Sequence, residues 1–158
     1  MYSTAKSICT GLRVAYVVFH ERFKDRLTRA IYNVNVKTSS LDVEIITQLI
    51  LSGDAHTIVA RKQELAHTAN TILNDVFPDA PRAGHPSSFF RWLPLLKEQV
   101  HTYSEEYFRS KGVQVYHSNR FLSGAQTGES FLRVALSSTS TLEELRAALS
   151  LLKRILDE

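Results

Sequence analysis

Cysteine is almost missing from this chain of 158 residues, whose one cysteine is Cys9. A single cysteine cannot form an internal disulfide, so a disulfide framework is excluded and a reducing, cytoplasmic location is expected. No apolar run approaches the roughly 20 residues that span a bilayer. The first residues also lack the basic-then-apolar pattern of a signal peptide. The sequence therefore predicts a cytoplasmic protein without a membrane partner.

An excess of charge of one sign is also missing. The formal net charge is +3, and Lys and Arg are scattered among Asp and Glu without forming a block, which argues weakly for nucleic-acid binding by this segment itself. The six histidines show no metal-ligand spacing, so no metal site is expected. What is present is the composition of an ordinary globular protein, 44% hydrophobic and 22% charged. The length suits one packed domain, or one domain plus part of another.

Hydrophobic patterning predicts the elements of the first half. Residues 12–19 are β-branched and aromatic and indicate a buried strand. Apolar residues recur at helical spacing over three stretches, which are 20–33, 41–51 with Ser40 as its cap, and 54–76. A group of Pro and Gly at 78–86 then predicts a linker.

The second half alternates strands and helices. The pattern predicts a strand at 89–95 ended by Pro94, a helix at 98–110, a strand at 113–116, a polar loop at 124–128 and a strand at 131–136. Thr141 and Glu144 form a capping box for a last helix that ends near residue 156. This order predicts an α/β or α+β fold in which helices cover a small sheet.

The most informative chemistry lies in the first 16 residues. Lys6 has a hydroxyl residue, Ser3, three positions before it and Arg13 seven positions after it. A lysine that forms an imine must lose its proton, which a neighbouring cation or partial burial favours. Arg13 could bind a phosphate and Gly11 would let the backbone approach it closely. The alternative is a solvated Lys6 and an Arg13 at a strand edge, since S-x-x-K alone is a common pattern.

The wider context of Lys6 favours the imine. Residues 3–16 resemble the lysine segment of fold-type I pyridoxal-phosphate enzymes, the aminotransferase class I/II superfamily, whose usual form is S-x-S-K followed by P-G-L-R-x-G-Y. The matching residues are Ser3, Lys6, Gly11, Leu12, Arg13 and Tyr16. Thr10 replaces the usual proline and Ala15 the usual glycine, and neither change removes a chemical group.

Three further segments extend the resemblance to the C-terminus. Residues 85–95 resemble the H-P-x-x-x-x-x-W-L-P-L strand of MocR-type regulators, which join a GntR-type winged helix to an aminotransferase-like domain. Residues 111–115 are similar to the R-x-G-V-x-V strand of that family. Residues 130–136 are similar to the strand that carries its carboxylate-binding arginine. Four segments in the correct order are far more specific than any one motif.

The resemblance implies a role for four residues. Lys6 would form the Schiff base with pyridoxal 5'-phosphate and move a proton in a catalytic member. Ser3 and Arg13 would bind the cofactor phosphate. Arg133 would bind the carboxylate of an amino-acid or 2-oxo-acid ligand. The alternative for Arg133 is a surface salt bridge, although its neighbours Leu132 and Val134 should face the core and turn Arg133 the opposite way.

The resemblance also implies an organisation. Residues 1–33 would be a remnant of the large pyridoxal-phosphate domain and 34–158 the small C-terminal domain, in a protein that forms a homodimer. The predicted function is the C-terminal fragment of the effector domain of a MocR/GntR-type transcriptional regulator, whose DNA contacts come only from a winged helix upstream. The alternative is a fragment of a pyridoxal-phosphate-dependent aminotransferase that exchanges an amino group between an amino acid and a 2-oxo acid. The 158 residues alone are expected to be inactive, because in the superfamily the groups that contact the cofactor ring lie upstream.

Overall fold

The computed structural model describes residues 2–81, 84–96, 99, 103–124 and 128–158. The chain divides into two compact units, which we call unit 1 (residues 1–62) and unit 2 (residues 63–158). The predicted linker at 78–86 and polar loop at 124–128 lie partly outside the described residues. The division after residue 33 that the resemblance implies stays a prediction.

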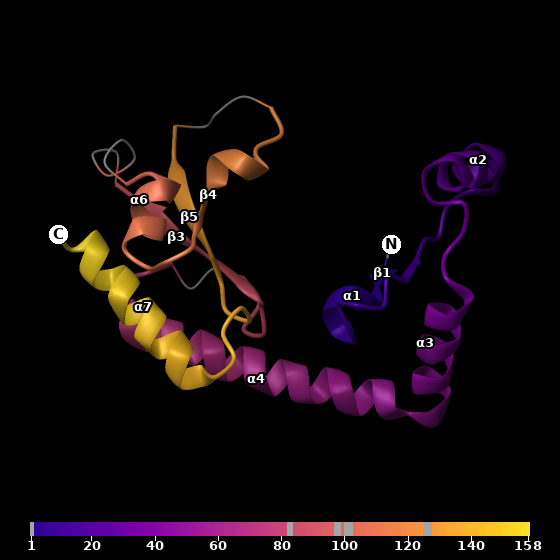
Figure 1. Cartoon of the computed structure of the whole chain (residues 1–158), viewed down its shortest axis with the longest axis horizontal. Coiled ribbons are helices and arrows are strands. Elements are labelled where there is room, and N and C mark those ends of the chain that lie inside the picture. The colour runs from indigo at the N-terminus through magenta and orange to yellow at the C-terminus, as the bar shows by residue number, and fades with distance from the viewer. Residues whose placement is uncertain (1, 82–83, 97–98, 100–102, 125–127) are drawn as a thin grey trace. The chain divides into compact units, whose positions relative to one another are not determined.

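Unit 1 consists of short elements followed by helices (Figure 1). In chain order these are β1 (Tyr2–Ser3), α1 (Thr4–Ser7), β2 (Ala15–Tyr16), η1 (Glu21–Phe23), α2 (Lys24–Asn35), α3 (Ser40–Ser52) and the first part of α4 (Asp54–Val76). Its core is small, formed by the buried Ile8, Val14, Ile46 and Ala55.

Local signals explain where α3 begins and ends. The cap is Ser39 rather than the predicted Ser40, because the Ser39 hydroxyl accepts a 3.3 Å hydrogen bond from the backbone N–H of Asp42 and Ser40 is already helical. At its end Gly53 has a φ of 86°, a left-handed conformation that glycine adopts without strain. The next helix, α4, has the predicted bounds.

The predicted buried strand at 12–19 is wrong. Only Ala15 and Tyr16 are in strand conformation, and they pair antiparallel with Ser3 and Tyr2. The following apolar residues are exposed, with Val18 at 94% of its full accessibility. A β-branched run is buried only where neighbouring strands cover it, and within unit 1 the two residues of β1 are its paired neighbour.

Unit 2 is an α+β fold, which confirms the predicted fold class. It contains the rest of α4, then β3 (Phe90–Leu95), α6 (Glu105–Ser110), β4 (Tyr116–His117), η2 (Ser118–Phe121), β5 (Ser130–Ala135) and α7 (Leu142–Leu156). The three strands form an antiparallel sheet in the order β3-β5-β4. Within the helix predicted at 98–110, Gln99 is helical, Tyr103 and Ser104 are not, and α6 begins at Glu105, while residues 98 and 100–102 lie outside the described residues. The strand predicted at 113–116 pairs with β5 only at 116–117.

One face of this sheet carries the core of unit 2. Leu93 and Leu95 of β3 and Leu132 and Val134 of β5 are buried, and α4 and α7 pack on them (Figure 1). The buried helix residues in the same cluster are Ala69, Ile72 and Leu73 of α4 and Leu145, Leu149, Leu152 and Ile155 of α7. The predicted capping box of α7 is confirmed, since the Thr141 hydroxyl accepts from the backbone N–H of Glu144 at 3.1 Å.

Strand β3 runs through Pro94 instead of ending there. The carbonyl of Phe89 accepts from the N–H of Leu136 at 2.9 Å, so alternate residues from 89 onward hydrogen-bond to β5 and the residues between them face the open edge. Pro94 is one of the residues that face the edge. Its missing N–H therefore costs the sheet no hydrogen bond.

Candidate functional site

Lys6 lies on α1, a helix of only four residues that needs anchors from outside itself. At its start the Ser3 hydroxyl accepts a 3.3 Å hydrogen bond from the backbone N–H of Ala5. Thr4 is fully buried, and its hydroxyl and its backbone N–H both donate to the carbonyl of Val14, at 2.9 and 3.1 Å. These bonds fasten the lysine segment to the residue after Arg13.

The end of α1 is held by a second lysine. The Nζ of Lys62, on α4, donates to the carbonyl of Ile8 at 2.7 Å and to that of Lys6 at 3.4 Å. A charged donor at the last carbonyls of a helix is stabilising because those carbonyls have no partner within the helix. Sequence reasoning missed Lys62, which lies more than 50 residues from α1 and carries no local signal of this contact.

The three predicted cofactor residues therefore share one small assembly. Ser3 pairs with Ala15 across β1 and β2, which brings Ser3 to the strand that follows Arg13. The side chains of Ser3, Lys6 and Arg13 are all exposed. The assembly carries a hydroxyl, an amine and a guanidinium, a donor set that suits a ligand carrying a phosphate and an aldehyde.

Arg133 lies in unit 2, on the sheet face opposite the core. It is half-buried between buried neighbours, Leu132 and Val134, so the predicted orientation is confirmed. It stands opposite Trp92 on β3 and Tyr116 on β4. Its Cζ is 3.7 Å from the ring centre of Phe90 and 4.7 Å from that of Phe121. Among the described residues its guanidinium forms no ion pair, so the alternative of a surface salt bridge finds no support there.

Beside Arg133, a cavity of about 460 Å³ opens where β4 pairs with β5 over two residues only. Its walls come from β5, the segment 112–116 and α7, and they include Arg133, Tyr116, Ala135, Ala148 and Leu149. The lining is mostly apolar, and Arg133 is the charged residue in it.

A second arginine of the same sheet was missed by sequence reasoning. Arg91 is buried, and its guanidinium donates to the side-chain oxygens of Asn70 and Asn74 at 3.1 and 3.2 Å and to the carbonyl of Pro81 at 2.8 Å. The signal was available, because Arg91 alternates in phase with Leu93 and Leu95 and period-two patterning places it on the core side. Its donors are used within the protein, so it serves packing and not ligand binding.

Glu105, at the start of α6, joins three segments. Its carboxylate accepts from the backbone N–H of His117 at 3.0 Å and forms an ion pair with Arg120 at 2.7 Å. Burial works against the charged form, but the hydrogen bonds and the charges of Arg120 and His117 outweigh it and lower the pKa of Glu105. The same pairing raises the pKa of Arg120. This group fixes β4 and η2, the segment that carries Phe121.

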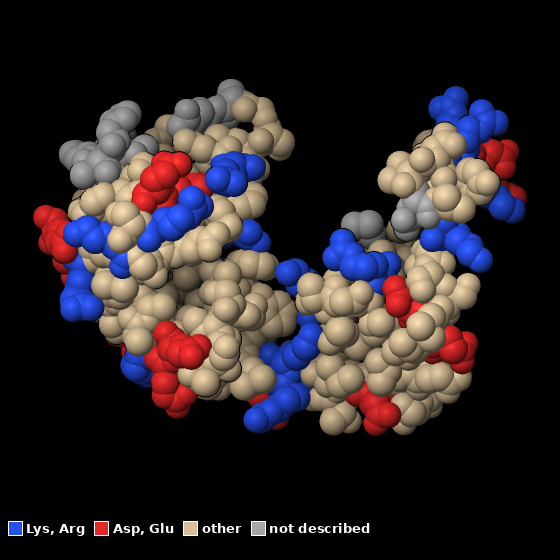
Figure 2. Space-filling model, in the orientation of Figure 1, with Lys and Arg blue, Asp and Glu red and all other residues tan. Residues whose placement is uncertain are grey.

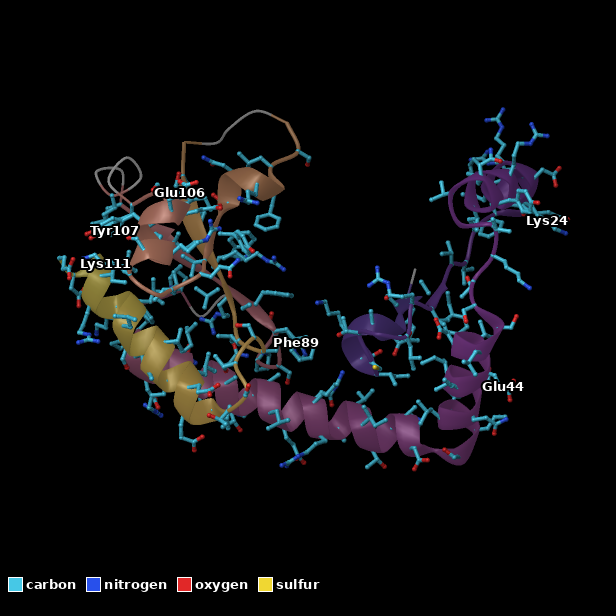
Figure 3. All side chains as sticks on the ribbon, viewed as in Figure 1. Lys24, Glu44, Phe89, Glu106, Tyr107 and Lys111 are labelled. Atoms are coloured by element: carbon cyan, nitrogen blue, oxygen red, sulfur yellow. The ribbon has the colours of Figure 1, made fainter. Side chains whose placement is uncertain are left out.

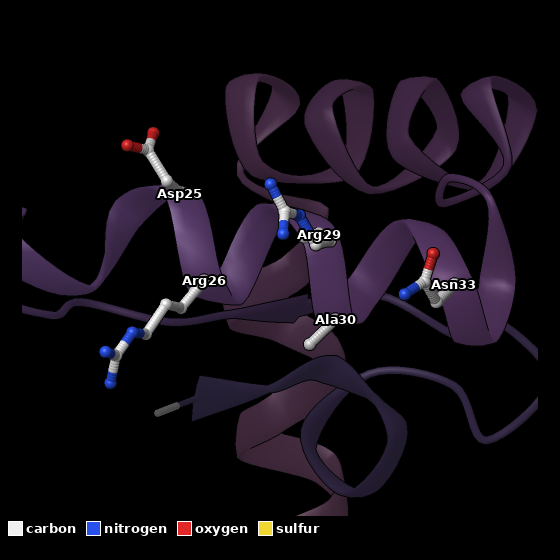
Figure 4. A pocket seen from close by; sticks show the side chains of 5 residues that line it. All are labelled: Asp25, Arg26, Arg29, Ala30 and Asn33. Atoms are coloured by element: carbon white, nitrogen blue, oxygen red, sulfur yellow. The ribbon is translucent and has the colours of Figure 1, made fainter.

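Other features carry less chemistry. Just after α6, the Nζ of Lys111 lies 5.4 Å from the ring centre of Tyr107 and 3.5 Å from the carboxylate of Glu158, and Glu158 raises the pKa of Lys111 (Figure 3). A hollow of about 330 Å³ in unit 1 is lined by residues of α2 alone, so it is a helix face (Figure 4).

Figure 2 shows cationic and anionic side chains interspersed on the visible face of unit 2. Among the described residues no cluster of His, Cys, Asp or Glu could hold a metal ion, and no helix has the length and apolar character needed to cross a membrane.

A small antiparallel sheet covered by helices, together with a lysine segment held by Thr4 and Lys62, is consistent with an aminotransferase-like α+β protein. The family model for aminotransferase class I and II matches residues 1–152, and the chain belongs to this family. The predicted family is thus confirmed.

The chain is also similar to a curated relative, an uncharacterized HTH-type transcriptional regulator, YdeF, of Bacillus subtilis (strain 168). The two are 33% identical over 156 residues, which is 99% of this chain and 34% of the relative. The chain therefore spans about a third of the length of the curated relative it matches.

Proposed function

We propose that residues 1–158 are the C-terminal part of a pyridoxal-phosphate-binding effector domain in a MocR/GntR-type transcriptional regulator. The observation that carries this proposal is the similarity to YdeF, an HTH-type transcriptional regulator, along 99% of the chain. Because the chain spans 34% of that relative, the winged helix that contacts DNA would lie outside residues 1–158. A regulator of this kind works in the cytoplasm.

The residues of the lysine assembly fit pyridoxal 5'-phosphate. Lys6 supplies the amine that attaches the cofactor through its aldehyde, and Arg13 supplies a guanidinium for the phosphate. The Ser3 oxygen already accepts from the N–H of Ala5, which leaves the hydroxyl proton to donate to a phosphate oxygen. When bound, the cofactor supplies a ring that accepts electrons from the Cα of an amino acid.

Arg133 is the proposed receptor for the carboxylate of an amino-acid or 2-oxo-acid ligand. Its Cζ is held against ring faces, and stacking on a face leaves the N–H groups at the edge of the guanidinium available to an anion. A ligand that binds one conformation of the effector domain more tightly increases the population of that conformation. Ligand binding would in this way change the state of an attached DNA-binding domain.

A homodimer is the proposed assembly. Unit 1 exposes large apolar side chains, among them Val18, Val34 and Leu51 at 94%, 88% and 74% of full accessibility. Exposed apolar side chains can mark an interface where they gather into a patch. The contact between subunits is therefore proposed on unit 1.

An aminotransferase is the second candidate. The observation that favours it is the family match itself, which covers residues 1–152 and describes a class of enzymes. Lys6 and Arg133 would serve either function, so the distinction depends on activity.

The cofactor part of the proposal is tested by trapping. The protein from the complete reading frame that contains residues 1–158 is incubated with pyridoxal 5'-phosphate, reduced with borohydride and digested. We expect the reduced pyridoxyl group on the peptide that contains Lys6. It should be lost in Lys6→Ala and retained in Lys24→Ala, a variant of another lysine in unit 1. A pyridoxyl group spread equally over other lysines and unchanged in Lys6→Ala would contradict the assignment.

The regulatory part is tested with the same protein. Sequence-specific binding to DNA upstream of its own gene, changed by the cofactor or by an amino acid, is expected for the regulator. Turnover of an amino donor with a 2-oxo acid at about 1 per second or faster, without specific DNA binding, would establish the aminotransferase instead.

A further inference from the structure

The arginines of unit 2 differ in what their guanidinium groups contact. The donors of Arg91 are taken by two asparagine side chains and a carbonyl, and those of Arg120 by the carboxylate of Glu105. Arg120 also lies over the ring of Tyr116, with its Cζ 5.0 Å from the ring centre. Arg133 contacts two ring faces, with its Cζ 3.7 Å from the centre of Phe90 and 4.7 Å from that of Phe121. Among the described residues its guanidinium donates no hydrogen bond, in contrast to the other two.

The two rings come from different elements. Phe90 begins β3, and Phe121 ends η2. Phe121 is supported in turn by Trp92, whose ring meets it edge to face with centres 5.7 Å apart and planes at 79°, a favoured aromatic geometry. Because Trp92 stands directly opposite Arg133 in the sheet, the support and the guanidinium share one face of the sheet.

Stacking of this kind restricts a guanidinium in a specific way. A ring beside the guanidinium plane attracts the cation and limits rotation of the side chain, but it takes none of the five N–H groups. Those groups lie in the guanidinium plane, where a planar carboxylate accepts two parallel hydrogen bonds. Pre-orientation lowers the entropy lost on binding, so it increases affinity without adding a contact to the ligand.

We propose that Phe90 and Phe121 are positioning residues that hold the Arg133 guanidinium edge-on to the carboxylate of the ligand. The inference rests on the proposed function, because it takes Arg133 as the carboxylate receptor. Phe121 is the more informative of the two rings. It is 47% exposed, so its removal should change the orientation of Arg133 more than the stability of unit 2.

The test uses a probe that cannot react with the cofactor. Propionate carries the carboxylate alone, and propionamide is its neutral isostere. Both are titrated into the ¹⁵N-labelled chain while the Nε–Hε resonance of Arg133 is followed, assigned by its absence in Arg133→Gln. We expect propionate to shift this resonance and propionamide to leave it unchanged.

The variants separate positioning from packing. Phe121→Leu and Phe90→Leu should each weaken propionate binding about tenfold and move the Nε–Hε resonance of the free protein toward its random-coil position, whereas Phe121→Tyr should keep both within about twofold. The matched control is Phe23→Leu. Phe23 is an exposed ring of unit 1 whose centre is 4.6 Å from the Cζ of Arg22, and its loss should leave both readouts unchanged.

Two results would overturn different claims. If Arg133→Gln abolishes propionate binding while both leucine variants bind like the parent chain, the positioning role is wrong and the receptor role stands. If propionate fails to shift the Arg133 resonance, or if its binding is unchanged in Arg133→Gln, the receptor role falls and the positioning role with it.

Discussion

The guanidinium of Arg91 on β3 donates a 3.1 Å hydrogen bond to the side-chain oxygen of Asn70 on α4. Asn70 is itself buried, and its amide donates to the carbonyls of Ala66 and Ser88 at 2.8 Å each. The pair therefore connects the long helix to the first strand of the sheet and to the turn before it. A buried cation satisfied by neutral oxygens is sensitive to any change that removes one of them.

Arg91→Lys is expected to destabilise unit 2 by about 2 kcal/mol. The planar guanidinium directs separate N–H groups to Asn70, Asn74 and the carbonyl of Pro81. A lysine ammonium is a compact charge and cannot reach all three acceptors at once. The measurement is chemical denaturation followed by the fluorescence of Trp92, the one tryptophan of the chain, which lies on β3. Arg109→Lys, an exposed position on α6, is the control and should stay within about 0.5 kcal/mol. Equal stabilities of the two variants would show that the buried network contributes nothing specific.

Glu105→Gln is expected to lower the stability of unit 2 by about 1 kcal/mol at neutral pH and by less in acid. The pKa of Glu105 is lowered in the folded protein, so between its folded and unfolded values the unfolded state binds more protons. The stabilisation is therefore complete above the unfolded pKa and disappears as the pH falls through the folded pKa. Denaturation midpoints are compared from pH 7 downward, with Glu106→Gln on the same helix as the control (Figure 3). A difference that grows as the pH falls would reverse this sign and refute the prediction.

Thr4→Val tests the anchor of the lysine segment. The change keeps the shape of a fully buried side chain but removes the hydroxyl that donates to Val14. We expect amide hydrogen exchange of residues 5–9 to accelerate about fivefold, the effect of one lost hydrogen bond. Thr68→Val is the matched control, because that hydroxyl makes an exposed bond within α4. Unchanged exchange in Thr4→Val would mean that the backbone bond from Thr4 is sufficient.

Lys62→Met tests the contact that sequence reasoning missed. The ammonium of Lys62 donates to the carbonyls of Ile8 and Lys6, and methionine keeps the length of the chain without the donor. We expect the end of α1 to loosen. The fraction of protein that carries a reduced pyridoxyl group on Lys6 at limiting pyridoxal phosphate should then fall about threefold. Lys24→Met, on α2 of the same unit, should give the same fraction as the parent protein. If both variants give the same fraction, Lys62 does not position Lys6.

Periodic helices were the most predictable part of the fold. The bounds of α4 and the cap of α7 follow from local patterns, since apolar spacing and a side chain three residues from its partner are both visible in the sequence. The run at 12–19 was not predictable in the same way, because the burial of a strand depends on which other strands cover it. Its composition was right for a core strand and its environment was not.

In the candidate site, too, local patterns were predictable and contacts between separate segments were not. The orientation of Arg133 follows from simple alternation with Leu132 and Val134, and the structure confirms it. The ring of Phe121 that touches it was not predicted, because η2 reaches Arg133 by folding back over a separation of 12 positions. The roles assigned to Ser3, Lys6, Arg13 and Arg133 stay predictions that the experiments above address.

The outer edge of β3 has a consequence for assembly. Three of its residues, Phe90, Trp92 and Pro94, turn their backbone groups away from β5. Pro94 has no N–H to offer, and the hydroxyl of Ser88 already donates to the carbonyl of Phe90 at 2.7 Å and accepts from its N–H at 3.3 Å. A strand added at this edge would pair mainly with the backbone N–H and C=O of Trp92, which is too few hydrogen bonds for stable strand pairing. Backbone pairing with a strand of a neighbouring molecule is therefore disfavoured along β3, and the edge of the sheet is protected from extension.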